Sequence, residues 1–215
     1  MKKIVFLLLF SLFTFFTYSQ QNLVLPSNVQ HSKPINSIVY SLSGNYLLTS
    51  SSDNTAKLWS KDLRLIYTFQ HTGCVNEAIF SPDERFIVTS SNDKTSKIWD
   101  IETGEDINTL SHNYEVMSAV FSSDSRFLLT VPNRLDYNST GIIFLWDLKT
   151  KINRFLIYDP NNPISSATIS PDNSMIVTGH ENGNTIIWNN EGKKINSYRI
   201  HNSMIMDIEF TLDGK

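Results

Sequence analysis

Cysteine is almost absent from this sequence, in which Cys74 is the only one. A single thiol cannot form an internal disulfide, so the fold does not depend on a disulfide framework. Cys74 comes just before a predicted strand, and no neighbouring residue supplies a base that would make its thiol a nucleophile. We therefore expect a small, partly buried side chain at this position.

Positive charge is also scarce. The chain has 18 Lys and Arg residues against 21 Asp and Glu, which gives a net charge of −3 at pH 7. A mildly acidic surface has no general attraction for nucleic-acid phosphates or for an anionic membrane. The composition therefore predicts that neither nucleic acid nor a membrane surface is a partner.

Catalytic and cofactor motifs are missing as well. The sequence has no Gly-rich phosphate loop and no Gly-x-Ser-x-Gly nucleophile motif. His180-Glu181 is not followed by the second histidine of a zinc-binding helix, and we expect this pair to lie in a turn. We expect no catalytic residues, no cofactor and no metal site.

The first 19 residues have the three parts of a secretory signal peptide. Lys2 and Lys3 give a short positive region, residues 4–16 are apolar apart from Ser11 and Thr14, and residues 17–19 end in a small residue. The apolar run is shorter than the ~20 residues of a membrane span, which disfavours a retained anchor. We predict cleavage before Gln20 and an exported protein, periplasmic or extracellular.

The sequence repeats with a period of about 40 residues. Four histidines mark the repeat, and separations of 40, 41 and 89 residues place a missing marker near Pro160: His31, His71, His112 and His201. The tryptophans form an independent ruler, with separations of 40, 47 and 42 residues: Trp59, Trp99, Trp146 and Trp188. We therefore divide the chain into repeats 31–70, 71–111, 112–158 and 159–200 and a partial repeat 201–215, within a domain of residues 20–215.

Each repeat predicts four short strands. Apolar residues recur seven and nine positions after each marker and again at fifteen and seventeen, and this period of two indicates strands with one buried face. A turn such as Ser81-Pro82-Asp83-Glu84 separates these two strands, a third strand ends at the tryptophan, and a fourth leads to the next marker. The partial repeat predicts one more strand before residues 211–214. A lone sheet of ~40 residues buries too little apolar surface, so neighbouring units must stack, as they do in a β-propeller.

Histidine, an Asp-rich hairpin and Trp-Asp at this period resemble the WD40 repeat, with literal Trp-Asp pairs at Trp99-Asp100 and Trp146-Asp147. The resemblance covers residues 22 to 215 and implies an all-β WD40 propeller of four-stranded antiparallel blades. Propellers of the TolB type share the Ser-Pro-Asp turn, but the histidine markers favour WD40.

The resemblance also implies a hydrogen-bonded network of His, Thr, Asp and Trp in each repeat. The matching positions in the first two repeats are His31, Thr49, Asp53 and Trp59, and His71, Thr89, Asp93 and Trp99. The third repeat keeps His112, Thr130 and Trp146 with Thr140 at the aspartate spacing, and the fourth keeps Thr178 and Trp188 with Pro160 and Asn182. We expect a complete network in two repeats only. Because these residues recur once per unit, we interpret them as structural rather than catalytic.

Propellers of this family most often have six to eight blades, so four units and one strand predict an incomplete ring. Such a ring would expose strand edges through which the chain could self-associate.

The resemblance implies a scaffold that binds another protein or peptide; the alternative is the propeller part of a larger exported enzyme. The interval from Thr130 to Trp146 is six residues longer than that from Thr89 to Trp99. The predicted partner-binding residues lie in this insertion: Arg134, Leu135, Asp136 and Tyr137.

Overall fold

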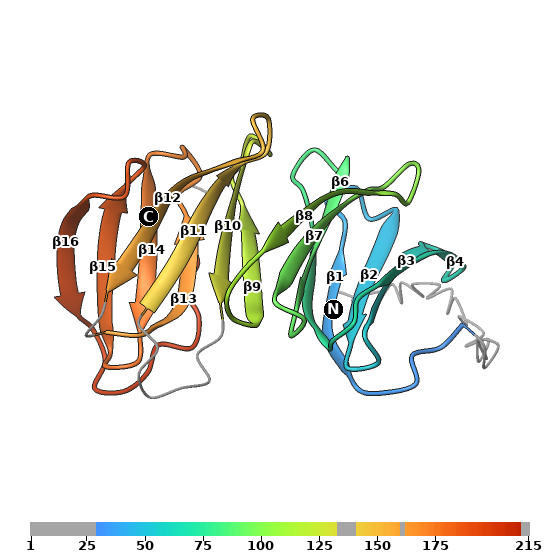
Figure 1. The fold of residues 1–215 in the computed structure, drawn as a ribbon, viewed down its shortest axis with the longest axis horizontal. Helices are drawn as coiled ribbons and strands as arrows, with labels where there is room; N and C mark the ends of the chain where they lie inside the picture. The colour runs from blue at the N-terminus through green and yellow to red at the C-terminus, as the bar shows by residue number, and fades with distance from the viewer. Residues whose placement is uncertain (1–28, 133–140, 160–161, 212–215) are drawn as a thin grey trace, which may run out of the picture. The chain divides into compact units, whose positions relative to one another are not determined.

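The computed structural model describes residues 29–132, 141–159 and 162–211. These residues form sixteen strands in four sheets, and each sheet contains four strands that are consecutive in the sequence (Figure 1). All the strand pairs are antiparallel. The prediction of an all-β fold built from four-stranded antiparallel blades is confirmed.

We number the four sheets as blades 1 to 4. Blade 1 contains β1 to β4: Ile35–Tyr40, Tyr46–Ser51, Thr55–Ser60 and Leu65–Gln70. Blade 2 contains β5 to β8: Val75–Phe80, Phe86–Ser91, Thr95–Asp100 and Asp106–Ser111. Blade 3 contains β9 to β12: Val116–Phe121, Phe127–Pro132, Gly141–Asp147 and Ile152–Asp159. Blade 4 contains β13 to β16: Ile164–Ile169, Met175–His180, Asn184–Asn189 and Lys194–Arg199.

The turn between the first two strands of a blade follows from its Ser-x-Asp sequence. In blade 2, the Ser81 hydroxyl donates to Asp83 Oδ1 over 2.6 Å, and the same carboxylate oxygen accepts the backbone N–H of Arg85. Glu84 takes a left-handed conformation with φ of 55°. Asp172 makes the corresponding bonds in blade 4, so the local sequence fixes where each hairpin reverses.

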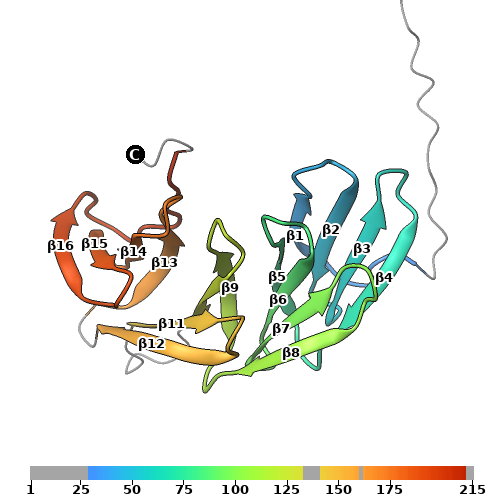
Figure 2. The same ribbon diagram turned by 90° about the horizontal axis from the view of Figure 1, so that it is seen from above.

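The core lies between blades. Figure 2 shows consecutive strands side by side within each blade. Three clusters of buried apolar side chains join blades 1 and 2, blades 2 and 3, and blades 3 and 4. Phe69, Leu110 and Ile157 from the fourth strands of blades 1 to 3 each belong to one of these clusters. Each blade therefore contributes one apolar face to each neighbouring blade with which it packs.

The prediction of a strand in the partial repeat is wrong. Residues 200–211 contain no strand, although the buried Ile205 contacts blade 4, where its N–H donates to the His180 carbonyl and its carbonyl accepts from Ser165 Oγ. The first strand of every blade pairs with the strand that follows it, and no second strand that could pair with residues 201–210 is present among the described residues.

The described residues contain no helix that is long and apolar enough to cross a membrane. The predicted signal segment, residues 1–19, lies outside the described residues.

Candidate functional site

The predicted network residues come from the same four places in blades 1 and 2. The histidine precedes the first strand, the threonine lies on the second, the aspartate lies in the turn after the second, and the tryptophan lies on the third. The strand pairing places Thr49 opposite Lys57 and Leu47 opposite Trp59, so hydroxyl and indole lie on adjacent strands. The turn between the second and third strands places the aspartate next to the histidine.

In blade 1 the structure brings His31, Thr49, Asp53 and Trp59 together. The Nδ1 atom of His31 lies 2.9 Å from Asp53 Oδ2, and its Nε2 atom lies 2.8 Å from Thr49 Oγ1. The Trp59 indole N–H donates to the same threonine oxygen over 3.0 Å. Asp53 also accepts the backbone N–H of Ser32 and thereby joins the turn to the segment before β1.

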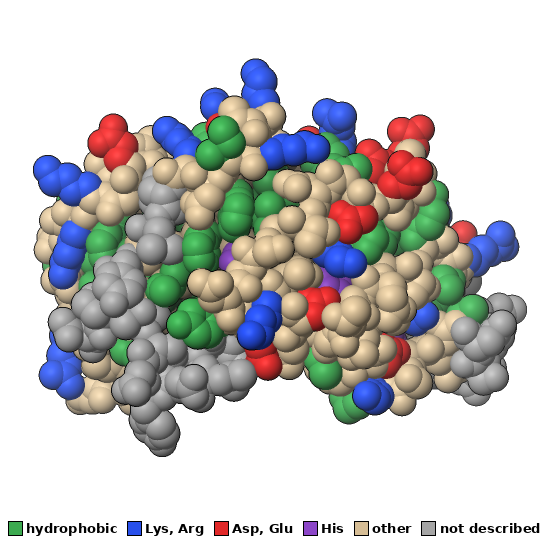
Figure 3. Space-filling view, in the orientation of Figure 1, with side chains coloured by type: hydrophobic (Ala, Val, Ile, Leu, Met, Phe, Trp, Pro, Cys, Tyr) green, Lys and Arg blue, Asp and Glu red, His purple; other side chains and the backbone are tan. Residues whose placement is uncertain are grey.

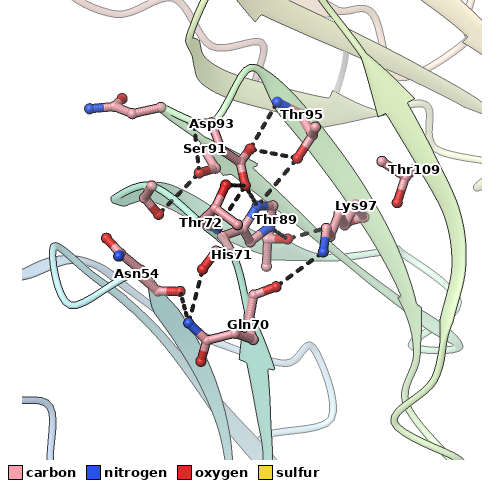
Figure 4. Close-up of polar contacts among 12 residues, drawn as sticks. Asn54, Gln70, His71, Thr72, Thr89, Ser91, Asp93, Thr95, Lys97 and Thr109 are labelled. Atoms are coloured by element: carbon pink, nitrogen blue, oxygen red, sulfur yellow. Dashed lines mark hydrogen bonds and ion pairs between the residues drawn. The ribbon is translucent and has the colours of Figure 1, made fainter.

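Blade 2 repeats this arrangement, and Figure 4 shows its histidine, threonine and aspartate. His71 Nδ1 lies 2.8 Å from Asp93 Oδ2, and His71 Nε2 lies 2.7 Å from Thr89 Oγ1. The Trp99 indole donates to Thr89 Oγ1 over 2.8 Å. Thr95 is a further member that the repeat spacing did not predict; its hydroxyl donates to Asp93 Oδ1 over 2.6 Å. Thr55 does the same for Asp53, so a threonine two residues after each aspartate was the available signal.

The bonds in blade 2 fix the direction in which each proton points. A carboxylate can only accept, so the His71 proton lies on Nδ1 and faces Asp93, and Nε2 of the neutral ring accepts the Thr89 hydroxyl proton. The Thr89 oxygen in turn accepts the Trp99 N–H. Burial lowers the pKa of His71, against the raising effect of Asp93, so the neutral ring that this chain of bonds requires is favoured.

The aspartates stay ionised at all ordinary pH values. Burial alone would raise the pKa of Asp93, but bonds from Thr95, Thr72 and His71 outweigh it and lower that pKa to about 2. For Asp53, burial also raises the pKa and the bonds from Thr55, His31 and Ser32 lower it to about 2. Each carboxylate is therefore a permanent acceptor that holds its turn against the preceding segment.

Blade 3 departs from the predicted network. The Trp146 indole donates to Thr130 Oγ1 over 3.0 Å, but neither ring nitrogen of His112 has a hydrogen-bond partner among the described residues. The ring instead packs edge-on against Phe144 and Trp146, with centroids 5.0 and 5.5 Å away. Burial lowers the pKa of His112 to about 4. Our inclusion of His112 in a hydrogen-bonded network is therefore wrong within the described residues.

The strand register of blade 3 differs from that of blades 1 and 2 in the residue opposite the threonine. Phe144 is paired with Thr130, the position at which blades 1 and 2 have Lys57 and Lys97. An aromatic ring at this position offers an edge contact to the imidazole. Thr140, which stands at the aspartate spacing, lies outside the described residues.

Blade 4 has a network that the sequence analysis missed. His180 is not in a turn, as predicted, but ends strand β14 and is completely buried. Its Nε2 atom lies 2.8 Å from Thr178 Oγ1, and its Nδ1 atom lies 2.8 Å from the backbone carbonyl of Asn162. The Trp188 indole donates to the same Thr178 oxygen over 2.9 Å. His180 thus supplies the imidazole in the repeat that lacks a histidine marker.

In blades 1, 2 and 4 these networks satisfy buried polar groups and give both nitrogens of each imidazole a hydrogen-bond partner. Among residues 29–132, 141–159 and 162–211, no group of three or more His, Cys, Asp or Glu side chains could hold a metal ion. The predicted partner-binding residues Arg134, Leu135, Asp136 and Tyr137 lie outside the described residues.

Comparison with known proteins adds evidence from sequence. The profile of the family described as "WD domain, G-beta repeat" matches residues 24–60, 63–100 and 153–189. The chain is also similar to the target of rapamycin complex subunit LST8 of Mus musculus and of Bos taurus, with 42% identity over 55 residues in each case. The subunit of Rattus norvegicus is 40% identical over 55 residues. The aligned stretch is 26% of this chain and only 17% of each relative.

Proposed function

Because this chain belongs to the WD40 repeat family, whose profile matches just over half of its length, we propose that it is a protein-binding scaffold without catalytic activity of its own. The blades would bind another protein or a peptide. Nucleic acid is disfavoured by the net charge of −3.

One observation carries this proposal: in blades 1 and 2 a buried carboxylate ties the β2–β3 or β6–β7 turn to the segment that enters the blade. Asp53 accepts from Ser32 and Asp93 accepts from Thr72, while the imidazoles of His31 and His71 bond the same carboxylates. Loops that a rigid framework holds in place are the usual sites of recognition. The chain therefore has the means to present a fixed set of turns to a partner.

The same contacts support the absence of catalysis. A general base needs a lone pair within reach of a substrate proton. In blade 2, Nε2 of His71 is occupied by Thr89, Nδ1 is occupied by Asp93, and the ring is only 2% exposed. His180 is buried and bonded at both nitrogens.

The relatives support a role in an assembly, because their name describes a subunit of a complex. From these relatives we propose for this chain only that it binds protein. We further propose that the insertion between β10 and β11 contributes to the partner surface through Arg134, Leu135, Asp136 and Tyr137. Arg and Tyr are enriched among residues that dominate interface energies.

We also propose that the protein is exported and acts outside the cytoplasm. The positive, apolar and small-residue regions of the first 19 residues support this proposal. Mass spectrometry of the N-terminus of the protein from its native source tests it. A first residue at Gln20 is expected, and a retained Met1 would contradict export by cleavage.

The scaffold proposal is tested by affinity purification of the tagged chain from its native source, after mild cross-linking. We expect one or a few proteins to copurify in near-stoichiometric amounts. A variant that lacks residues 134–139 restores the shorter hairpin of blade 2 and should lose part of this set. Failure to recover any stoichiometric partner, together with reproducible turnover of a substrate by the purified chain, would overturn the proposal.

A further inference from the structure

A pocket of about 380 Å³ lies between blades 2 and 3, at the end of the blades opposite to the histidine networks. The β5–β6, β9–β10 and β11–β12 turns surround it, and successive antiparallel strands place these turns at the other end from the β6–β7 turn that holds Asp93. This pocket contains none of the residues that the networks use.

The floor of the pocket is apolar. Phe86, Ile98, Ile107 and Leu148 contribute to its lining. Ile98 is buried, and Ile107 on the outer strand β8 is 39% exposed, as is Ile66 at the equivalent position of blade 1. The pocket has room for an apolar side chain that these residues would remove from water.

The rim of the pocket is cationic, in a chain whose net charge is negative. Arg85, Arg126, Lys149 and Lys151 line it and are exposed. Figure 3 shows Lys and Arg side chains along the top of the view, at the end where Figure 1 shows the β11–β12 turn. Arg126 pairs with Asp147 over 2.9 Å, whereas no ion pair joins the other three cations to any described residue.

The two acidic residues of the lining do not cancel these cations. Asp83 accepts from the Ser81 hydroxyl and the Arg85 N–H, and Asp124 accepts from the Ser122 hydroxyl and the Arg126 N–H. These donors are neutral, so both carboxylates keep their charge. Four cations and two carboxylates line the pocket, a net charge of +2, which becomes +1 when Asp147, the ion-pair partner of Arg126, is counted. The rim keeps a positive balance that would attract carboxylates.

The outer strand of blade 2 differs from that of blade 1 at the position that faces the next blade. In blade 1, Tyr67 is paired with Leu58, and its hydroxyl donates to the Glu102 carbonyl of blade 2 over 2.8 Å. Its ring lies against Gly104, where an added Cβ would approach the ring to 2.6 Å. In blade 2 the equivalent position, paired with Ile98, is Asn108, which lines the pocket. A short amide therefore stands where the neighbouring junction has an aromatic ring.

The partner of that ring also differs. The position of Gly104 in the β7–β8 turn corresponds to Lys151 in the β11–β12 turn, and both residues have positive φ, at 73° and 59°. Lysine is strained in this conformation, whereas glycine is not. The junction between blades 2 and 3 thus has a pocket and a lysine, whose Nζ lies 3.5 Å from the Ile107 carbonyl of blade 2, where the preceding junction has an aromatic contact.

We propose that this pocket binds an acidic peptide segment of the partner, with one apolar side chain of the peptide seated between blades 2 and 3. The carboxylates of the peptide lie against Arg85, Lys149 and Lys151. This inference rests on the proposed protein-binding function and assigns part of it to a defined surface.

The test uses the full chain and a fluorescein-labelled peptide of sequence Asp-Glu-Leu-Phe-Glu-Asp, followed by fluorescence anisotropy. We expect saturable binding that weakens as the NaCl concentration rises. Two control peptides test the two parts of the site: one has two serines in place of Leu-Phe, and the other has Lys and Arg in place of the acids. The affinity of each should be at least about tenfold lower.

The decisive variant is Asn108→Tyr combined with Lys151→Gly, which copies the Tyr67–Gly104 contact of the preceding junction. This variant should fold, because it fills a gap and removes a strained conformation, and it should lose about tenfold in affinity or more. Lys149→Glu should weaken binding, whereas Lys193→Glu, the same charge change in the β15–β16 turn, should not.

Lack of saturable binding to the wild-type chain, or equal binding by the double variant, would overturn the proposal. Equal binding of the serine peptide, or of single-stranded DNA, would show a general anion surface and would also overturn it. If affinity purification recovers the same partners with the double variant as with the wild type, the pocket assignment fails while the scaffold function stands.

Discussion

The imidazole of His180 bonds the hydroxyl of Thr178 from the same strand, two residues further along β14. In blades 1 and 2 the corresponding imidazole comes from the segment before the first strand, 18 residues ahead of its threonine. The proton chain from indole to hydroxyl to imidazole is the same in both cases, but in blade 4 it ends at the Asn162 carbonyl instead of a carboxylate.

His180→Ala should destabilise the protein substantially. The change removes the imidazole acceptor of the Thr178 hydroxyl, which keeps only the Ile186 carbonyl at 3.4 Å as an acceptor, and it removes the donor to the Asn162 carbonyl. An unsatisfied buried group costs about 1–3 kcal/mol. Urea denaturation measures this loss. His201→Ala is the matched control, because His201 has a marker position but is exposed, and it should change the stability by less than about 0.5 kcal/mol. Equal effects of the two changes would refute the role of His180.

Trp99→Ala should cost about 3–5 kcal/mol, the usual loss for truncating a large buried aromatic side chain. Trp99 is 7% exposed, packs against Phe69 across the junction, and donates to Thr89. Trp99→Phe keeps most of the packing but deletes the donated bond, so it should cost less. Thermal or urea unfolding distinguishes the two, and an unchanged unfolding midpoint for Trp99→Ala would show that this indole is not a core residue.

The free energy of unfolding should fall as the pH is lowered from 6.5 towards 4, in part because of His112. Its folded pKa of about 4 lies below the ordinary value of 6.5, so the unfolded chain binds more protons in this window. The contribution of the neutral His112 imidazole to the free energy of unfolding is fully present above pH 6.5. It is lost as the pH falls through the folded pKa, and the total loss is on the order of 3 kcal/mol.

His112→Leu should flatten this dependence, while His201→Leu should leave it as in the wild type. At pH 7.5 the His112→Leu variant should be as stable as the wild type or more so, because it removes two buried nitrogens that have no described partner. Urea unfolding at pH 7.5 and pH 5.0 makes the comparison. An unchanged difference between the two pH values in His112→Leu would contradict this assignment.

Gly104→Ala should be clearly more destabilising than Gly44→Ala. Both glycines have positive φ, at 73° and 68°, so both changes strain the backbone by about 1–2 kcal/mol. A Cβ at Gly104 would also collide with the Tyr67 ring, whereas a Cβ at Gly44 meets nothing within 4 Å. Differential scanning calorimetry of the two variants separates strain from collision, and equal shifts in melting temperature would argue against the Tyr67–Gly104 contact.

The sequence predicts the blades well because strand, turn and core signals recur in register. Apolar positions such as Val75, Ala78 and Val88 follow the repeat and are buried in the clusters between blades. The networks of blades 1 and 2 follow from the spacing of His, Thr, Asp and Trp, because identical strand pairing carries identical spacings to identical places.

Repeat spacing does not predict a network residue that comes from a different position of the repeat. His180 replaces a missing marker from a position that is Ser51 or Ser91 in the first two blades, and no alignment of equivalent positions reveals it. His112 keeps its spacing to Thr130 but turns to Phe144, because that partner differs. The pocket depends on Asn108 facing the next blade, and such contacts across a junction are visible only in three dimensions.

The three apolar clusters have a consequence for how the chain folds and how damage spreads within it. Each cluster draws on two blades that are consecutive in the sequence, so apolar packing among the described residues couples each blade to its neighbours along the chain, as in a one-dimensional lattice. Each blade is also a run of adjacent hairpins that can form while later residues are still being synthesised. A defect at one junction then lowers the coupling between two neighbours and divides the molecule into separately melting segments, rather than weakening all four blades alike.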